Sequence, residues 1–344
     1  MLSMHEDSQP TLVAALAAHA ATGILICADS AVCNETDGQA ALLTAVVTAV
    51  RAFGQVHVLA EAAEARVTAG VRRNLTVADA IRREGARPVL MNELTASATW
   101  PVLIVGTSTP EPPTDHNHGL ALRVCWSGWV AQVATPRVST LRPGGSCVLA
   151  AIAAAAMGVS EIFDAARARA GSDAGYRTVA LNLWNPDGSV DDQGPSLAHA
   201  ASAWWLVGLG HLGQAYAWTI SWLPYEDPGA VEIVLQDTDR TVPANHSTGV
   251  LTPRGSTGIR KTRLVAASLD EAGFDTRIVE RRLGVDMRAA AEECHVALLG
   301  LDNLPTRRLT SGVNWLFAVD VGLGSGPKDF SSLLLRRVSR CTPK

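Results

Sequence analysis

The chain has 344 residues, 47% of them hydrophobic and 18% charged, so it can bury the cores of one large or two medium globular domains. Its net charge of −4 provides no positive field, which argues against nucleic-acid binding. The six cysteines contain no Cys-x-x-Cys pair, so we expect neither a disulfide framework nor a structural zinc site.

The N-terminus, MLSMHEDSQP, carries no targeting signal that we can identify. It is polar and acidic and does not lead into the apolar segment of a signal peptide. No apolar run reaches the length that a bilayer requires. We therefore expect a cytoplasmic protein that binds no membrane.

In the first half, short β-branched runs alternate with Ala- and Leu-rich helical stretches, which predicts an α/β fold with a parallel sheet. The turn after the first strand, Ala28 to Gly38, lacks closely spaced glycines and should hold no phosphate. The last helix is apolar nearly all round, and because charged residues end its apolar run we expect a buried core helix. The predicted strands are 23–29, 56–60, 101–106 and the run 120–133, and the predicted helices are 38–54 and 145–170.

A domain boundary is predicted at Asn185 to Ser196, where Pro, Gly, Asp and Ser gather and hydrophobic periodicity stops. We expect residues 1–190 to form a degenerate α/β domain. Residues 198–344 should form a Rossmann-like, doubly wound nucleotide-binding domain. Its predicted strands are 203–210, 231–237, 275–282, 295–302 and 314–322, and its predicted helices are 211–223, 259–273 and 286–294.

The turn that opens this second half carries Gly208, Gly210 and Gly213 between a strand and a helix. Such glycines allow a tight turn, close approach of a phosphate and close helix packing. Asp237 and Asp239 end the next strand, where a carboxylate can accept hydrogen bonds from ribose hydroxyls of NAD or of ATP. These residues alone leave an NAD(P)-dependent oxidoreductase as the default.

Further residues favour ATP. Asn245 and Lys261 follow the acidic turn, and Asp302-Asn303 ends a later strand. Together with the glycines and Asp237, this set resembles the ThiF/MoeB family, the activating enzymes of ubiquitin-like proteins. That family's pattern combines Gly-x-Gly-x-x-Gly, Asp-x-Asp, Asn-x-x-Arg, a Lys and a strand-end Asp-Asn, and the spacings from Asp237 to Asn245 and to Lys261 match it.

The resemblance covers residues 204 to about 326 and implies ATP-dependent adenylation of the C-terminal carboxylate of a small ubiquitin-like or sulfur-carrier protein. A cation and a metal ion would stabilise the charge that develops at the phosphate. A second copy of this chain, forming a homodimer, is a further partner compatible with the resemblance. The resemblance implies that the ATP phosphates would be contacted by Gly208, Gly210, Gly213, Asn245 and Lys261. Asp237 would bind the ribose and Asp302 a Mg²⁺ ion, and Asp239 and Asn303 would belong to the same nucleotide site. The resemblance also implies that Lys261 and Asp302 are catalytic.

Two departures from the family pattern leave alternatives open. The arginine expected four residues into the Asn-x-x-Arg motif is Thr248, and its substitute could be Arg240, Arg254, Arg260, His246 or a group from a partner subunit. The only cysteine in the direction of a thioester-forming region is Cys341, which we interpret as an incidental thiol. These departures favour, as a further alternative, a pseudo-enzyme scaffold that binds a nucleotide or a partner without turnover.

Overall fold

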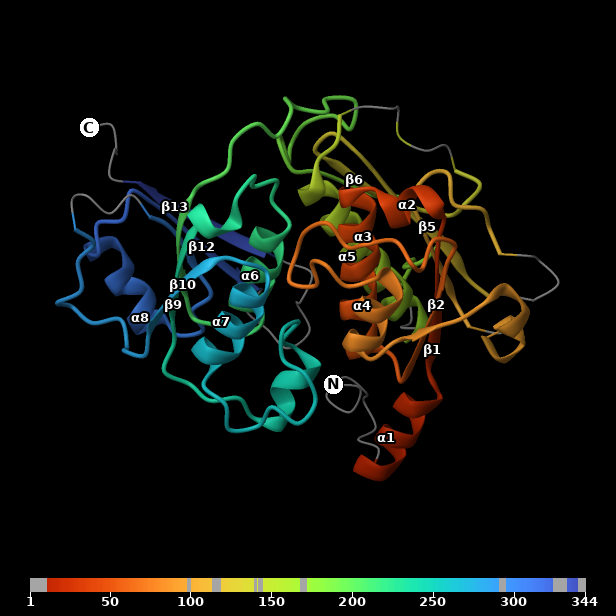
Figure 1. Ribbon diagram of the computed structural model, residues 1–344, viewed down its shortest axis with the longest axis horizontal. Helices are drawn as coiled ribbons and strands as arrows, with labels where there is room; N and C mark the ends of the chain where they lie inside the picture. The colour runs from red at the N-terminus through yellow and green to blue at the C-terminus, as the bar shows by residue number, and fades with distance from the viewer. Residues whose placement is uncertain are drawn as a thin grey trace. The chain divides into compact units, whose positions relative to one another are not determined.

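The computed structural model describes residues 11–97, 100–112, 119–138, 141, 145–167, 172–290, 295–323 and 333–339. The chain divides into two compact units, Met1–Ala198 and His199–Lys344. Each unit is built on one mostly parallel sheet with helices packed against it (Figure 1). This confirms the α/β class, with a Rossmann-type half preceded by a further α/β half. The roles predicted for the two domains stay predictions.

The first unit contains a seven-stranded sheet in the order β3-β2-β1-β4-β5-β6-β7. The strands from β3 to β5 pair in parallel, whereas β6 pairs antiparallel with both β5 and β7. The strands are β1 (Gly23–Ala28), β2 (Gln55–Ala60), β3 (Arg87–Pro88), β4 (Val102–Val105), β5 (Ala121–Ser127), β6 (Val130–Ala134) and β7 (Val179–Asn182). Its helices are α1 (Leu12–Ala21), α2 (Ser30–Asn34), α3 (Thr36–Ala52), α4 (Val77–Glu84), the 3₁₀ segment Met91–Ser97 and α5 (Val148–Ala166).

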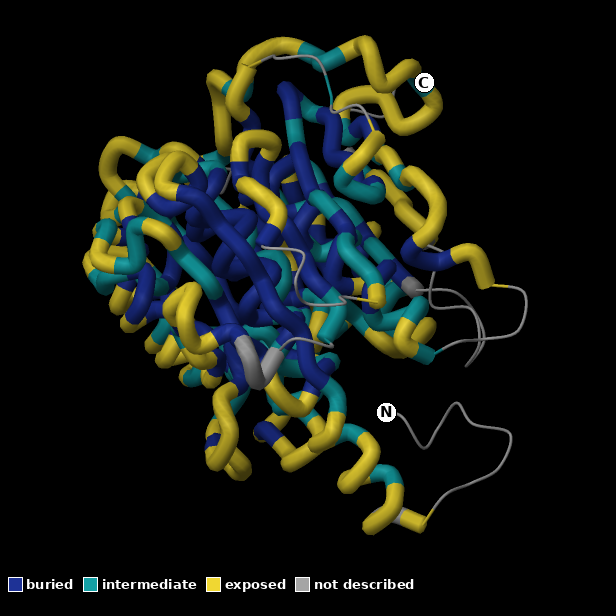
Figure 2. The backbone as a smooth tube through the Cα atoms, turned by 90° about the vertical axis from the view of Figure 1, so that its right-hand side faces the viewer, coloured by how far each residue is buried: buried dark blue, intermediate teal, exposed yellow. Residues whose placement is uncertain are grey.

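Helix α5 is the core helix of this unit. It packs against α3 and strands β4, β5 and β6, and Ala150, Ala151, Ala154 and Ala155 are each 0% exposed. Its length and composition would allow it to cross a membrane, so the expectation that no apolar run is long enough is wrong, yet half of its most apolar window is buried inside the protein. The predicted core helix is thus present, although residues 168–170 of the predicted span lie outside the described residues. Figure 2 shows long buried runs of the chain in the interior and exposed runs along the outer loops.

The predicted linker folds onto the first unit. The side-chain amide of Asn182 donates hydrogen bonds to the carbonyls of Ser189 and Asp192, at 2.9 and 2.7 Å. The indole of Trp129 donates to the carbonyl of Pro195 at 2.6 Å. The polar composition of this segment therefore indicates a turn-rich loop that finds its hydrogen-bond partners within the unit.

The second unit contains a six-stranded sheet in the order β10-β9-β8-β11-β12-β13, in which only the β12–β13 pairing is antiparallel. In both units the first five strands thus follow the same spatial order, third, second, first, fourth and fifth. The strands are β8 (Ala203–Val207), β9 (Glu232–Gln236), β10 (Asp275–Val279), β11 (Val296–Leu299), β12 (Phe317–Leu323) and β13 (Leu333–Ser339). The helices are α6 (His211–Ser221), α7 (Lys261–Glu271), α8 (Leu304–Leu309) and the 3₁₀ segments Pro228–Ala230, Pro243–Ser247 and Thr310–Gly312.

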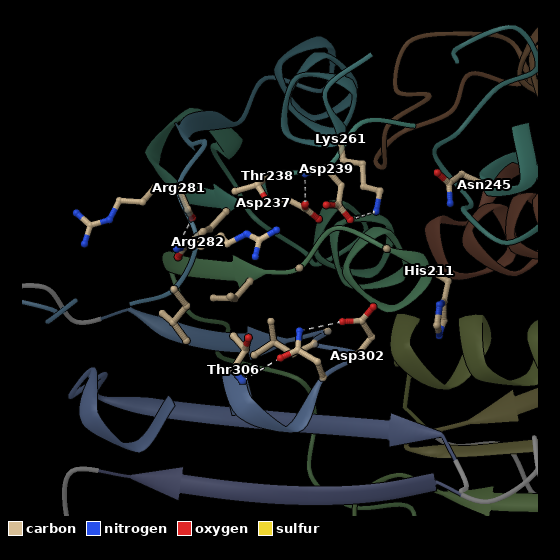
Figure 3. A pocket seen from close by; sticks show the side chains of 18 of the residues that line it. His211, Asp237, Thr238, Asp239, Asn245, Lys261, Arg281, Arg282, Asp302 and Thr306 are labelled. Carbon is tan, nitrogen blue, oxygen red and sulfur yellow. Dashed lines mark hydrogen bonds and ion pairs between the residues drawn. The ribbon is translucent and has the colours of Figure 1, made fainter. Parts of the chain in front are cut away.

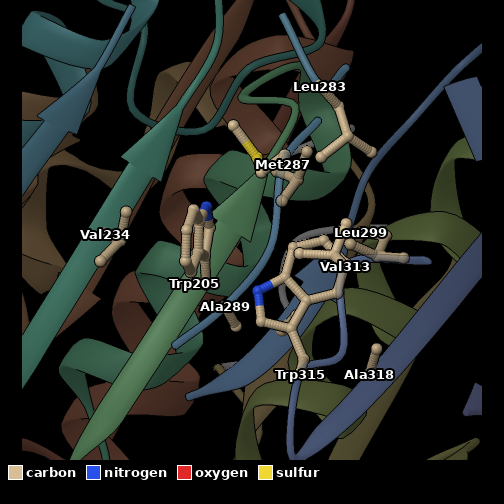
Figure 4. Packing of buried hydrophobic residues seen from close by; sticks show 11 residues of the cluster. Trp205, Val234, Leu283, Met287, Ala289, Leu299, Val313, Trp315 and Ala318 are labelled. Carbon is tan, nitrogen blue, oxygen red and sulfur yellow. The ribbon is translucent and has the colours of Figure 1, made fainter. Parts of the chain in front are cut away.

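The helix predicted over 286–294 is wrong for residues 286–290, which form a turn and irregular backbone, and residues 291–294 lie outside the described part of the chain. Here Met287 and Ala289 are buried while Arg288 and Ala290 are exposed, a period-two pattern that no helix face has. Both buried residues join a cluster around Trp205 and Trp315 (Figure 4). Tertiary burial thus overrides the helical composition of this segment.

Glycine is required at one position of α5. A Cβ added at Gly158 would lie 2.3 Å from Cγ1 of Val124 and 2.8 Å from Cδ1 of Leu103. Gly158→Ala should therefore destabilise the protein by about 1–3 kcal/mol through overpacking, although alanine favours helices. Chemical denaturation followed by tryptophan fluorescence measures this change, with Ser160→Ala on the exposed side of α5 as the control. A Gly158→Ala protein as stable as wild type would contradict the close packing of α5 on the sheet.

Candidate functional site

A pocket of about 480 Å³ lies at the carboxyl ends of β8, β9, β10 and β11. The strand order reverses between β8 and β11, which is the position where open α/β sheets bind ligands. Of the residues predicted for the site, all but one line this pocket, and Gly213 lies inside α6 instead. The predicted residues that line it are Gly208, Gly210, Asp237, Asp239, Asn245, Lys261, Asp302 and Asn303 (Figure 3).

The glycine turn is defined by close backbone contacts. Gly208 has a φ of +82°, and a Cβ there would lie 2.7 Å from the carbonyl oxygen of Gly300. A Cβ at Gly213 would lie 2.0 Å from the carbonyl oxygen of Gly208, so α6 can approach the turn only without a side chain at that position. A Cβ at Gly210 would meet nothing within 4 Å. Gly210 begins α6 without a capping side chain, so the first helix N–H groups face the pocket, where they can bind an anion.

Asp237 fixes the loop after β9 to the glycine turn. Its Oδ2 accepts the N–H of Leu209 at 2.6 Å, and its Oδ1 accepts the N–H of Asp239 at 2.7 Å. A carboxylate has about four lone-pair sites, so Asp237 can still accept hydrogen bonds from ligand hydroxyls.

Lys261 is the first residue of α7 and contacts the same loop twice. Its backbone N–H donates to the carbonyl of Asp239 at 3.0 Å, and its Nζ lies 2.9 Å from Oδ2 of Asp239. The side chain of Lys261 is only 11% exposed. The ammonium group is therefore held beside the pocket by a single carboxylate.

Asp302 lies on the opposite side of the pocket from the Lys261–Asp239 pair (Figure 3). Asn303 orients it, because Nδ2 of Asn303 donates to Oδ1 of Asp302 at 3.2 Å while Oδ1 of Asn303 accepts the N–H of Thr306 at 2.9 Å. Among the described residues no group of three or more His, Cys, Asp or Glu side chains could hold a metal ion. A magnesium ion would therefore fit here only with Asp302 and ligand oxygens, an arrangement that Mg²⁺ accepts.

Arg307 holds the backbone that carries Asp302. Its Nε and Nη2 donate to the carbonyl of Leu301 at 2.9 and 2.6 Å, and its Nε lies 3.7 Å from Oδ1 of Asp320 in the middle of β12. Asp320 is 6% exposed, and its Oδ1 has no hydrogen-bond partner among the described residues. Burial and the charge of Asp320 raise the pKa of the neighbouring Tyr216 to about 12. The Arg307 guanidinium therefore both compensates a buried carboxylate and anchors the loop of Asp302.

Thr248, where the resemblance expects an arginine, does line the pocket. The alternatives considered within the chain, Arg240, Arg254, Arg260 and His246, are not among the residues that line it. Arg260, the N-cap of α7, instead lies 3.7 Å from Glu280 and donates a hydrogen bond to the carbonyl of Thr238.

The pocket arginines are Arg281 and Arg282, which the motif comparison missed. The available signal was their place at the end of the strand predicted over 275–282, next to the strand that ends at Asp237. His211 adds no charge to these cations, because desolvation lowers the pKa of its ring and keeps it neutral near pH 7.

The equivalent position of the first unit is filled by the protein itself. Asp29 follows β1, and its Oδ1 accepts the N–H of Val32 at 2.9 Å and so caps the five-residue helix α2. Val32 is 5% exposed, and its Cγ2 lies 2.6 Å from where a Cβ on Gly106, after β4, would be. The carboxylate and the valine thus occupy the turn where the second unit leaves space for a ligand.

The fold and the pocket define a Rossmann-type α/β protein with a ligand pocket where the strand order reverses. Two family profiles match the chain in order, the BilD N-terminal domain over residues 23–183 and the BilD C-terminal domain over residues 200–342. The chain is 38% identical over 302 residues to the bacterial E1-like protein BilD of Collimonas sp. (strain OK412), a match that covers 86% of this chain and 63% of that protein. The chain belongs to this family of bacterial E1-like proteins, which confirms the family expected from the motifs.

Solved structures give weaker likenesses. Escherichia coli MccB with ATP has a TM-score of 0.30 at 16% identity, over 35% of this chain and 36% of that chain. The same protein with succinimide has a TM-score of 0.31 at 13% identity, over 59% of this chain and 68% of that chain. Scores this low carry no functional conclusion.

Arg307→Ala should destabilise the protein by about 3 kcal/mol, because it leaves the buried carboxylate of Asp320 without its nearest cation. Arg308→Ala, an exposed neighbour on the same helix, should change the free energy of unfolding by less than about 0.5 kcal/mol. Urea denaturation measures both. Adding Asp320→Asn to Arg307→Ala should recover part of the lost stability. Equal stabilities of Arg307→Ala and Arg308→Ala would argue against the interaction between Arg307 and Asp320.

Nucleotide should protect only the second unit from hydrogen exchange. With ATP and Mg²⁺ present, amides of residues 208–214 and 237–245 should exchange more slowly. Amides of residues 28–38 should be unaffected, because Asp29 and Val32 fill their turn. Peptide-resolved hydrogen exchange on the full chain measures this, and direct protection of residues 28–38 would refute our interpretation of the first unit.

Proposed function

We propose that the chain adenylates the C-terminal carboxylate of a small ubiquitin-like or sulfur-carrier protein, with ATP as the co-substrate. The observation that carries this proposal is the convergence of the glycine turn, Lys261 and Asp302 on one pocket. Each comes from a different strand end or helix start, so only the folded sheet brings them together. A nicotinamide cofactor would have been favoured if Lys261 and Asp302 lay far from the glycine turn. Both residues instead line the same pocket as the turn.

The proposed reaction joins a carboxylate oxygen of the carrier protein to the α-phosphorus of ATP. The bond between that phosphorus and the oxygen bridging to the β-phosphate breaks, and pyrophosphate leaves with the electron pair. The step brings a carboxylate and a polyphosphate together, so it needs positive charge where negative charge develops. Lys261 and the N–H groups at the start of α6 provide that charge beside the phosphates.

Asp302 would hold a magnesium ion together with phosphate oxygens, and the ion would supply further charge stabilisation when bound. Asn303 contributes by fixing the direction of the Asp302 carboxylate. Asp237 would accept hydrogen bonds from the ribose, beside its bonds to the glycine turn. Asn245 completes the phosphate side of the pocket, with its Oδ1 already accepting the N–H of Val242 at 2.8 Å.

The first unit would serve as a pseudo-adenylation domain that binds no nucleotide and contributes to recognition of the carrier protein. We place the reaction in the cytoplasm, and a homodimer stays an option. The chain spans 63% of the Collimonas relative's length, so the activity and partners of the longer protein are part of this proposal. Cys341, which lies outside the described residues, is given no role in adenylation.

Purified protein should bind ATP with Mg²⁺ more tightly than NAD⁺ or NADP⁺ and should exchange pyrophosphate into ATP when its carrier protein is present. Asp302→Asn should lower the exchange rate by about 10²–10³, because losing one electrostatic stabiliser of the transition state has an effect of that size. Cys341→Ser should change it less than a few-fold, since adenylation precedes any thioester. Calorimetry and isotope exchange with a panel of small carrier proteins measure these quantities.

The alternatives give different results in the same assays. Tighter binding of NAD⁺ or NADP⁺ than of ATP would indicate an oxidoreductase instead of an adenylating enzyme. ATP binding without exchange for any carrier would favour a nucleotide-binding scaffold, for which the uncharged Thr248 is the supporting feature. Wild-type exchange in Asp302→Asn would remove Asp302 from the mechanism.

A further inference from the structure

The charged side chains that line the pocket balance one another. Three carboxylates, those of Asp237, Asp239 and Asp302, line it together with the cations of Lys261, Arg281 and Arg282. A polyanionic ligand such as ATP needs an excess of positive charge, so the cations that are not already neutralised within the protein decide where its phosphates bind.

Two of the three cations have a carboxylate partner. Nζ of Lys261 lies 2.9 Å from Asp239, and Nη2 of Arg281 donates to Oδ2 of Asp286. Arg282 is exposed, and its side chain forms no ion pair and donates no hydrogen bond to any residue that the structure describes. Its guanidinium is the pocket cation available to a ligand without breaking an existing pair.

The backbone on both sides of Arg282 is fixed. The carbonyl of Arg281 accepts a hydrogen bond of 2.9 Å from Nε2 of Gln236, a buried residue whose Oε1 in turn accepts the indole N–H of Trp205 at 2.9 Å. On the other side, Leu283 is 7% exposed and belongs to the Trp205 cluster. Such anchoring presets the position of the arginine, so less conformational entropy is lost when it binds.

The direction of the two arginines differs. Figure 3 shows the side chain of Arg282 extending into the pocket toward Asp237, whereas that of Arg281 extends away from it. Arg282 follows β10, two strands from the glycine turn after β8, with the strand of Asp237 between them. Neighbouring strands are about 4.8 Å apart, so an extended arginine can cross the intervening strand and reach the space between Asp237 and the turn.

We propose that Arg282 binds the phosphate next to the ribose and so supplies the cation that Thr248 does not. This inference rests on the proposed nucleotide site, in which Asp237 binds the ribose and the start of α6 faces the phosphates. The α-phosphate is also the group that the carboxylate attacks. Arg282 would therefore act both in nucleotide binding and in stabilising the charge of the adenylation step.

The test compares Arg282→Ala and Arg282→Lys with Arg277→Ala, a control on β10 whose side chain pairs with Glu232 at 2.6 Å and does not line the pocket. Affinities for ATP, AMP and adenosine are measured by calorimetry and by competition on the full chain. Arg282→Ala should weaken ATP and AMP by the same factor, about tenfold to a hundredfold, because a hydrogen bond to a charged group is lost. The affinity for adenosine should not change, Arg282→Lys should bind ATP and AMP with intermediate affinity, and Arg277→Ala should bind all three ligands like wild type.

Each other result overturns the assignment in its own way. A loss of ATP affinity without a loss of AMP affinity would place Arg282 beyond the α-phosphate, and an equal loss for adenosine would make it a contact to the base or ribose. Unchanged affinities in Arg282→Ala would remove it from the site, while the proposed function would stand. If the wild-type chain binds no ATP, the proposed function fails first and the role of Arg282 falls with it.

Discussion

The second unit depends on one constraint, the close approach of three backbone segments at the carboxyl end of β8. The carbonyl of Gly208 would clash with a Cβ on Gly213. In the same way, the carbonyl of Gly300 would clash with a Cβ on Gly208. These contacts bring the start of α6 against the turn and the end of β11 beside it. The pocket opens where the side chain at Gly210 is absent, so it exists because glycine stands at these positions.

Around this turn, charged side chains are arranged in chains of contacts. Asp237 connects the turn to Asp239, Asp239 holds Lys261, and on the far side Asp320 supports Arg307 beneath the backbone of Asp302. Each group is oriented by a residue from a neighbouring strand end or helix. A site built in this way is preorganised, because its charged groups already have their positions before a ligand arrives.

The two units show how one strand order can give different chemistry. Both sheets place a glycine after the fourth strand of the unit, Gly106 in the first and Gly300 in the second. In the first unit Val32 fills the space beside that glycine and the carboxylate of Asp29 caps the same turn, whereas in the second unit the space is left to a ligand. The fold therefore provides the position of a site, and the residues of one turn decide whether it is open.

The sequence by itself determined the α/β class, most strands and the residues of the glycine turn, because alternating periodicity and glycine spacing are local signals. It also placed Asp237, Lys261 and Asp302, since each follows a strand or starts a helix at a fixed spacing. It could not find Arg282 or Arg307, whose roles come from neighbouring strands and from a buried carboxylate far along the chain. It also mistook residues 286–290 for a helix, because only the packed core, with Met287 and Ala289 beside Trp205, decides that this segment is irregular.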